Sequence, residues 1–243
     1  MKLSGKTAVV TGGGSGIGAA VAHALAAEGC RVVIAGRQVE KLREVAAHFK
    51  GAPAIEVHEC DVADRGSVNK LFAWIKEKIG DVHILVNGAG VNIKNRMMSD
   101  MRPEQWDQVM AINATGAYNC MYEVLPQMRK RKDGVIVNIS STSGKRAAKL
   151  GGVAYNASKF ALTALSVSVA NEEANNGIRV TAICPGEVDT PILANRPSAV
   201  SDEHRARMLQ PEDIAAAVML VATLPPRAHV LEMIIKPITQ EFA

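Results

Sequence analysis

The chain has 243 residues, a length that a large α/β domain can use as a single unit. Hydrophobic residues make up 48% and charged residues 21%, which supplies a core and argues against disorder. A net charge of +4 with only 4% aromatic residues argues against nucleic-acid binding, because no aromatic platform is interleaved with the cations. The four cysteines form no C-x-x-C pair, so we expect small core residues in a reducing compartment and no metal site.

The chain shows no targeting or membrane signal. Residues 1–6 lack the apolar region of a signal peptide, and the longest apolar stretch, 215–224, is half the length of a membrane span. We therefore expect a cytoplasmic protein without a membrane partner.

Short β-branched runs alternate with longer helical patterns along the chain. The expected strands are 7–11, 31–35, 54–60, 83–87, 135–139, 179–184 and 230–236. The expected helices are 16–29, one ending near 50, 64–79, 103–132 with a break near Asn113, 155–175 and 211–224. Continuous apolar strands are typical of a parallel sheet buried on both faces. The alternation predicts a doubly wound α/β fold, mostly parallel with about seven strands, in a single domain over 1–243. The irregular segment at about 190–210 is expected to be mobile over the site.

A glycine-rich loop, T-G-G-G-S-G-I-G at residues 11–18, follows the first expected strand and opens the first helix. Glycine lets the backbone approach a pyrophosphate, and a helix N-terminus supplies N–H groups and positive potential. A merely flexible loop is the alternative, but the position between strand and helix favours phosphate binding. With the spacing T-G-x-x-x-G-I-G, the sequence resembles the short-chain dehydrogenase/reductase family, in its single-domain branch, from about residue 6 to 184.

The turn after the second strand bears on the choice of dinucleotide. An NAD-preferring site usually has an acidic residue there, whereas this chain has Gly36 followed by Arg37. A guanidinium could bind a 2′-phosphate, and in the family a basic residue here accompanies NADP(H). We therefore expect NADP(H), although Arg37 could instead only cap a loop.

Three further segments match cofactor motifs of the family. Asp61 corresponds to the aspartate that binds the adenine amino group; it could also cap the next helix, a role that Asp64 fits better. N-G-A-G at 87–90 matches the family's N-N-A-G, with Gly88 in place of the second Asn. P-G-E-V-D-T-P at 185–191 resembles the loop that caps the nicotinamide. The resemblance implies these cofactor-binding residues: Gly12, Gly14, Ser15, Gly16, Ile17, Gly18, Arg37, Asp61, Val62, Asn87, Ala89, Gly90, Tyr155, Lys159, Pro185, Gly186, Val188 and Thr190.

Tyr155 and Lys159 are four residues apart, so on a helix they share a face. A cation about 4 Å from the phenol could lower its pKa from about 10 by at most about three units, less the effect of desolvation. An ordinary surface pair is the alternative, but the glycine loop upstream favours an acid/base pair.

A carbonyl reductase also needs a second donor to hold the substrate oxygen. The family pattern places the catalytic serine three residues before a glycine, which selects Ser141 in N-I-S-S-T-S-G; Ser140 and Thr142 are alternatives. Asn113 is unfavourable in mid-helix and matches the family asparagine at a helix kink, whose carbonyl retains a water that leads to Lys159. The alternative for Asn113 is an exposed polar residue.

The sequence gives fewer indications of the substrate than of the cofactor. The end at 231–240 looks like that of bacterial NADP-dependent dehydrogenases of serine-like 3-hydroxy acids. Five basic residues are expected near the mouth of the substrate site: Lys94, Arg96, Lys145, Arg146 and Lys149. They either form a solvated rim or bind an anionic substrate, such as a 3-oxo or 3-hydroxy acid or a 3-oxoacyl compound. Reduction of neutral ketones or aldehydes, and an NADP-binding regulator without turnover, are the alternatives. The family usually forms homodimers or homotetramers through its long helices, here expected at 113–132 and 155–175.

Overall fold

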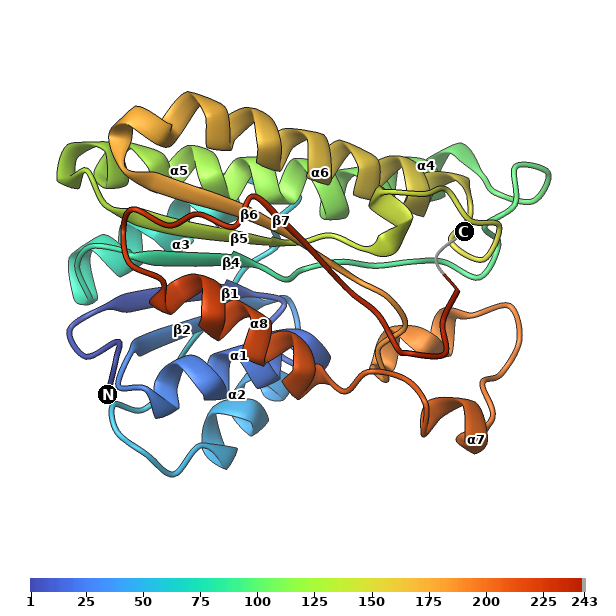
Figure 1. Ribbon diagram of the computed structural model, residues 1–243, viewed down its shortest axis with the longest axis horizontal. Helices are drawn as coiled ribbons and strands as arrows, with labels where there is room; N and C mark the ends of the chain where they lie inside the picture. The colour runs from blue at the N-terminus through green and yellow to red at the C-terminus, as the bar shows by residue number, and fades with distance from the viewer. Residues whose placement is uncertain (242–243) are drawn as a thin grey trace.

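The computed structural model describes residues 1–241 and consists of a parallel seven-stranded sheet covered by helices on both faces (Figure 1). The strands are β1 (Thr7–Thr11), β2 (Arg31–Gly36), β3 (Glu56–Glu59), β4 (Ile84–Asn87), β5 (Gly134–Ile139), β6 (Ile178–Pro185) and β7 (Glu232–Ile235). Their order is β3-β2-β1-β4-β5-β6-β7, and every neighbouring pair is parallel. The direction of winding reverses between β1 and β4, and ligands of doubly wound folds bind at this switch point. The predicted fold class is confirmed.

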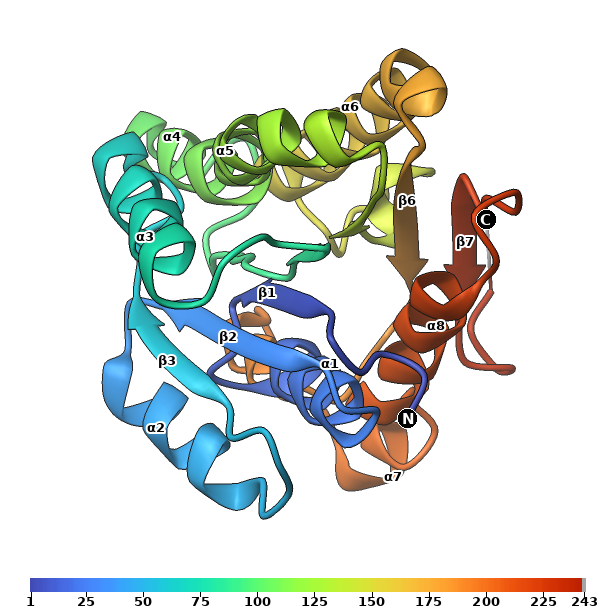
Figure 2. The ribbon, with the colours of Figure 1, turned by 90° about the vertical axis from the view of Figure 1, so that its left-hand side faces the viewer.

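The helices form one layer on each side of the sheet (Figure 2). One face carries α1 (Gly16–Ala27), α2 (Val39–His48) and α8 (Pro211–Thr223). The other carries α3 (Arg65–Lys78), α4 (Pro103–Met110), α5 (Gly116–Arg131) and α6 (Val153–Glu173). The short helix α7 (Asp202–Arg205) lies outside these layers, beside the carboxyl ends of the strands (Figure 1). No helix within residues 1–241 is both long and apolar enough to cross a membrane.

The core is divided by the sheet into two apolar clusters. Alternate residues of β1 show the division, because Val10 packs in the cluster with α1 and α8 while Val9 packs in the cluster with α3 and α5. Both side chains are fully buried. This explains why the strands read as continuous apolar runs, since neither face of the sheet meets solvent.

The elements differ from expectation mainly at their ends. The two edge strands, β3 and β7, are shorter than the predicted runs at 54–60 and 230–236, because each pairs with a neighbour on one side only. The helix expected at 103–132 is interrupted near Asn113, as predicted, by a π-helical turn over Ala111–Thr115. Such turns are frequent at functional sites.

Candidate active site

A cavity of about 560 Å³ opens where the loops that follow the strands converge, at the right of Figure 1. Its volume falls in the range typical of small-molecule sites. Of the residues predicted to bind cofactor, all but Asn87 line it: Gly12, Gly14, Ser15, Gly16, Ile17, Gly18, Arg37, Asp61, Val62, Ala89, Gly90, Tyr155, Lys159, Pro185, Gly186, Val188 and Thr190. Ser141 lines the same cavity, whereas Asn113 lies behind it.

The glycine loop is packed so closely that side chains could not be accommodated. A Cβ at Gly12 would lie 2.8 Å from the backbone of Ala89, and one at Gly18 would lie 2.3 Å from the Gly12 carbonyl oxygen. Ser15, at the start of α1, makes no side-chain capping bond. The N–H groups of the first turn of α1 are therefore left for another acceptor, and they fit the phosphates of a dinucleotide.

Two basic residues line the cavity beside Gly36, where the sequence predicted one. Arg37 follows β2 directly, and Lys41 lies on the first turn of α2. Lys41 is close to the glycine loop, because a Cβ added at Gly14 would lie 3.5 Å from the Lys41 Cβ. The position of Lys41, one helical turn after the Gly36–Arg37 turn, is the feature of the sequence that indicates a second basic residue at this site. This pair can bind a phosphate at the far end of the cavity from Tyr155.

The two carboxylates after β3 have separate roles. The Asp64 side chain accepts a hydrogen bond from the Gly66 N–H at 2.8 Å and caps α3, as its position suggested. Asp61 lines the cavity, and its Oδ1 accepts from the Ala63 N–H at 3.0 Å. The capping alternative for Asp61 is therefore taken by Asp64, which leaves the second oxygen of Asp61 for a ligand.

Asn87 does not contact the cavity, contrary to the direct cofactor contact we expected. Its side chain is buried and donates to the Asn138 side chain at 2.8 Å, which joins the ends of β4 and β5. Asn138 in turn donates to Ser166 on α6 at 2.8 Å. Asn87 is thus placed to position the loop after β4 rather than to touch a cofactor. In that loop a Cβ at Gly88 would lie 2.8 Å from the Thr11 carbonyl oxygen, so a second asparagine would not fit this backbone.

The structure separates the competing hydroxyls after β5. Ser140 is turned into the protein, where its Oγ donates to the Lys159 carbonyl oxygen at 3.1 Å and lies 2.8 Å from Thr163 Oγ1. Ser141 instead lines the cavity with Tyr155, where it is close enough to lower the pKa of the phenol, and its Oγ accepts from the Ser143 N–H at 3.1 Å. Gly144 permits this arrangement, because a Cβ there would lie 2.6 Å from the Lys159 carbonyl oxygen. This close approach of the turn to α6 explains the serine-to-glycine spacing.

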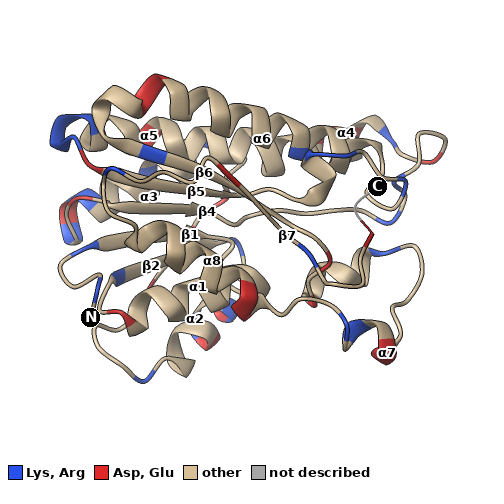
Figure 3. Ribbon diagram, in the orientation of Figure 1, with Lys and Arg blue, Asp and Glu red and all other residues tan. Residues whose placement is uncertain are grey.

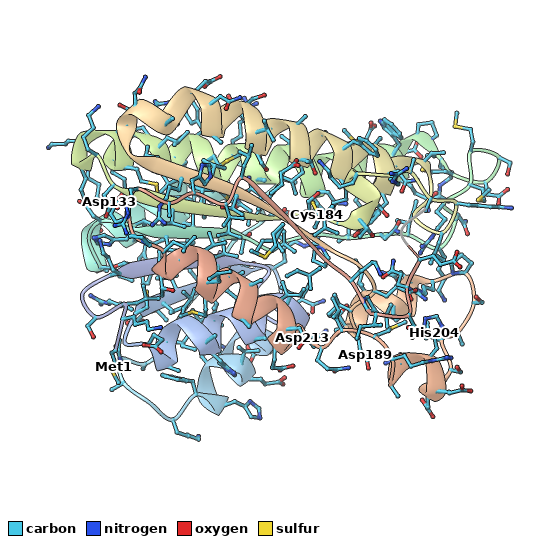
Figure 4. All side chains as sticks on the ribbon, in the orientation of Figure 1. Met1, Asp133, Cys184, Asp189, His204 and Asp213 are labelled. Atoms are coloured by element: carbon cyan, nitrogen blue, oxygen red, sulfur yellow. The ribbon has the colours of Figure 1, made fainter. Side chains whose placement is uncertain are left out.

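Tyr155 and Lys159 lie on the same face of α6, as the four-residue spacing requires. The Lys159 Nζ is 5.6 Å from the centre of the Tyr155 ring and donates to the Ile139 carbonyl oxygen at 2.8 Å. Only 4% of Lys159 is exposed, and this burial lowers the pKa of its ammonium to about 8, against a smaller opposing effect of Cys184. Cys184 is on β6, near the centre of the molecule (Figure 4).

The pKa of Tyr155 shows a different balance from the one that we expected. Burial raises the pKa of the phenol, and this effect outweighs the lowering by the hydrogen bond from Ser141 and by the positive charge of Arg96. Lys159 is not among the groups that lower it. The expected lowering by Lys159 is therefore not found, because the lysine is itself desolvated and directs its ammonium to a backbone carbonyl.

Asn113 connects the π-helical turn to two parts of the site. Its Oδ1 accepts from the Val91 N–H at 2.8 Å, and its Nδ2 donates to the Val91 carbonyl oxygen at 2.9 Å and to Ser158 Oγ at 3.0 Å. It is 1% exposed, so the alternative of an exposed polar residue is wrong. The role of an Asn113 carbonyl in holding a water for Lys159 stays a prediction.

The loop after β6 is held by ion pairs from the segment that we expected to be mobile. Glu187 accepts from Arg196 at 2.6 Å and lies 2.8 Å from His204, and Asp189 pairs with Arg205 at 2.7 Å. Figure 4 labels Asp189 and His204 in this region, and Figure 3 shows residues of both charges around α7. Burial acts to raise the pKa of Glu187, but the bonds from His204 and Arg196 hold it below its usual value. The segment therefore has defined contacts, and its mobility stays a prediction.

The five basic residues expected at the mouth do not act together. Among them only Arg96 lines the cavity. Lys145 is paired with Glu232 of β7 at 2.7 Å, and Lys94 is exposed away from the cavity lining. Arg196, which we had not singled out, lines the cavity as well. The idea of a broad basic rim is therefore replaced by a single buried guanidinium and a paired one.

Comparison with known proteins agrees with this geometry. Residues 6–201, more than half of the chain, match the short chain dehydrogenase family. The chain belongs to that family. An uncharacterized oxidoreductase of Staphylococcus aureus (strain USA300) is 35% identical over 97% of this chain and 99% of its own length. The resemblance drawn from the motifs is thus confirmed, and the short-chain dehydrogenase described here is an oxidoreductase of that family.

Two solved structures of similar fold contain a bound dinucleotide. The closed form of serine dehydrogenase with NADP⁺ superposes with a TM-score of 0.88 at 28% identity, covering 98% of this chain and 97% of the other. A 3-ketoacyl-(acyl-carrier-protein) reductase from Brucella melitensis with NADH has a TM-score of 0.87 at 27% identity, covering 96% and 98%. The fold and the cavity thus belong to a group whose members hold either dinucleotide.

Proposed function

We propose that this short-chain dehydrogenase is NADP(H)-dependent and transfers hydride between the nicotinamide and a carbonyl or secondary alcohol. We propose a small 3-oxo or 3-hydroxy acid, or a 3-oxoacyl compound, as substrate. The observation that carries the proposal is that Ser141, Tyr155 and Lys159 line one cavity together with the glycine loop. Two hydroxyls and a buried ammonium are the groups that carbonyl reduction requires.

The chemistry follows from what each group can donate. When bound, the nicotinamide supplies a hydride that forms the new C–H bond at the carbonyl carbon. Ser141 and Tyr155 both donate to the carbonyl oxygen, and Tyr155 gives its proton to that oxygen as the negative charge develops. The raised pKa of Tyr155 keeps the phenol protonated and ready to donate. Ser141 and the charge of Arg96, which lower the pKa of the phenol, then stabilise the phenolate until Lys159 resupplies the proton, and the reverse sequence oxidises an alcohol.

The preference for NADP(H) is supported by the turn after β2. Gly36 leaves no carboxylate to bind the ribose hydroxyls, and Arg37 and Lys41 line the cavity there. Each charge-assisted hydrogen bond to a 2′-phosphate contributes about 1.5–3 kcal/mol. The serine dehydrogenase complex contains NADP⁺, whereas the Brucella reductase complex contains NADH. Measured KM values for both coenzymes therefore decide the question, and a lower KM for NADH would contradict the proposal.

A homodimer or homotetramer is also proposed. Large side chains are exposed on the helices of one layer, namely Trp106 on α4, Tyr118 and Tyr122 on α5 and Phe160 on α6. Such side chains are enriched at interfaces between subunits. Analytical ultracentrifugation of the purified protein tests this proposal, and a single monomeric species would contradict it.

The decisive experiment is an assay of NADPH consumption by absorbance. The substrates are 3-oxo acids, 3-oxoacyl thioesters, aldehydes and neutral ketones, each tested with NADPH and NADH. We expect turnover of at least one 3-oxo acid or 3-oxoacyl thioester. Tight NADPH binding without oxidation by any substrate would indicate a regulator instead. Turnover of neutral ketones alone would keep the reaction and reject the substrate class.

A further inference from the structure

Arg96 is an arginine buried at the substrate end of the cavity. It is only 5% exposed, yet it lines the cavity together with Tyr155. Its Nε donates to the Ile93 carbonyl oxygen at 2.8 Å, its Nη1 donates to that of Leu150 at 2.7 Å, and its Nη2 donates to that of Asn195. One side chain therefore ties together three loops that are distant in sequence.

These contacts leave the positive charge of Arg96 without a paired anion and some of its N–H groups without an acceptor. A guanidinium has five N–H groups, and three are accounted for by the carbonyls. Among residues 1–241 no carboxylate forms an ion pair with Arg96, and the nearby Arg196 is already paired with Glu187 at 2.6 Å. Burial, followed by the charge of Arg196, lowers the pKa of Arg96. A buried guanidinium without an anion is costly, and this fold retains one.

A structural role alone does not explain the choice of arginine. A neutral amide side chain could donate to two of these carbonyls without burying a charge, so holding the loops does not by itself require a guanidinium. The backbone at Arg96 also packs closely against the start of α6, because a Cβ on Gly152 would lie 2.4 Å from the Arg96 Cβ. The charge is close enough to Tyr155 to act on its hydroxyl. An anion that entered the cavity beside Tyr155 would meet this guanidinium.

We propose that Arg96 determines specificity by binding the carboxylate of the substrate while Ser141 and Tyr155 hold its carbonyl oxygen. This inference rests on the proposed function and narrows its substrate class to compounds that carry an anionic group near the carbonyl. The bond to Asn195 links the same guanidinium to the segment over the site. The bound anion would therefore also hold that segment in place through Arg96. Exposed Lys94 makes no such contribution, since it does not line the cavity.

The test compares one acid with its neutral ester in four proteins. Reduction of acetoacetate and of methyl acetoacetate is measured with NADPH for the wild type, Arg96→Met, Arg96→Lys and the control Lys94→Met. The ratio of the two kcat/KM values is the readout, because a damaged loop lowers both values whereas a lost carboxylate contact lowers only one. NADPH binding, followed by fluorescence, checks that each variant is folded.

We expect the wild type to prefer the acid and Arg96→Met to lower the ratio by about 10- to 100-fold. Arg96→Lys should restore part of the ratio, since it keeps the charge but loses bidentate binding. Lys94→Met should match the wild type. An Arg96→Met variant that lowers both substrates equally would assign Arg96 a structural role and overturn the inference. A wild type that prefers the ester would also overturn it, while one that reduces no carbonyl compound would reject the proposed function itself.

Discussion

The two ends of the cavity are built in different ways. At the cofactor end, residues 11–18, Gly36–Arg37 and Asp61 each come directly after a strand of the sheet, and the backbone itself shapes the space. At the substrate end, residues 91–96, 148–152 and 190–196 meet through side chains, with Arg96 as their common partner. The first end is therefore shaped mainly by the backbone and the second by hydrogen bonds of side chains. Tyr155 and Ser141 lie between the two ends.

The largest effect should come from the group at this junction. Tyr155→Phe removes the proton donor while leaving the ring, so kcat should fall by about 10²- to 10⁴-fold. Neither end of the cavity is altered, so NADPH binding should be unchanged. Steady-state rates and fluorescence titration measure the two quantities. Tyr122→Phe is the matched control, since Tyr122 is 66% exposed on α5. A Tyr155→Phe variant with a rate near that of the wild type would show that Tyr155 is not the proton donor.

Ser141 and Ser140 provide a second test, because their side chains point in different directions. Ser141→Ala should lower kcat by about 10²-fold, since it removes one donor to the substrate oxygen. Ser140→Ala leaves buried groups near Thr163 unpaired and should lower the free energy of unfolding by about 1–3 kcal/mol, with little change in kcat. Rate assays and urea unfolding of both variants measure the contrast. The opposite result would show that Ser140 holds the substrate.

The sequence predicted the cofactor end better than the substrate end, for a physical reason. The glycine loop, the turn after β2 and the Tyr155–Lys159 pair can each be recognised from the spacing of residues within one short segment. Asn87 was misjudged because its partner, Asn138, lies on another strand. The role of Arg96 among the basic residues could not be recognised, since its partners are up to 99 residues away. Likewise, the pKa of Tyr155 depends on burial, which a four-residue spacing does not reveal.

A substitution at the cofactor end should change the coenzyme without changing the chemistry. A Cβ at Gly36 would lie 3.7 Å from Leu42 Cδ2, which is an ordinary contact, so the backbone tolerates a side chain. Gly36→Asp should raise the KM for NADPH relative to that for NADH by about 10- to 100-fold, because a carboxylate repels the 2′-phosphate and binds ribose hydroxyls. The matched control is Gly36→Asn, which has nearly the same volume without the charge. Equal shifts for Asp and Asn would attribute the effect to volume alone.

The smallest effect concerns stability, and it tests whether the ammonium of Lys159 is buried as the structure indicates. Burial holds its pKa at about 8 in the folded protein, below the value of 10.5 for a free lysine. Below pH 8 the charge is present in both states, so the folded state bears the cost of burying it. Between pH 8 and 10.5 the folded protein releases this proton while the unfolded chain keeps it, so stability rises with pH. Lys159→Met lacks this contribution.

The measurement is the difference in unfolding free energy between Lys159→Met and the wild type, without cofactor, at pH 7.5 and 9.5. We expect the unfolding free energy of Lys159→Met, relative to that of the wild type, to be lower at pH 9.5 than at pH 7.5 by about 1–2 kcal/mol. Cys30, Cys60 and Cys120, whose pKa values are raised by burial, destabilise both proteins at high pH and cancel in the difference. Lys94→Met should follow the wild type at both pH values. A difference that does not change with pH would mean that the Lys159 ammonium reaches solvent and is not buried.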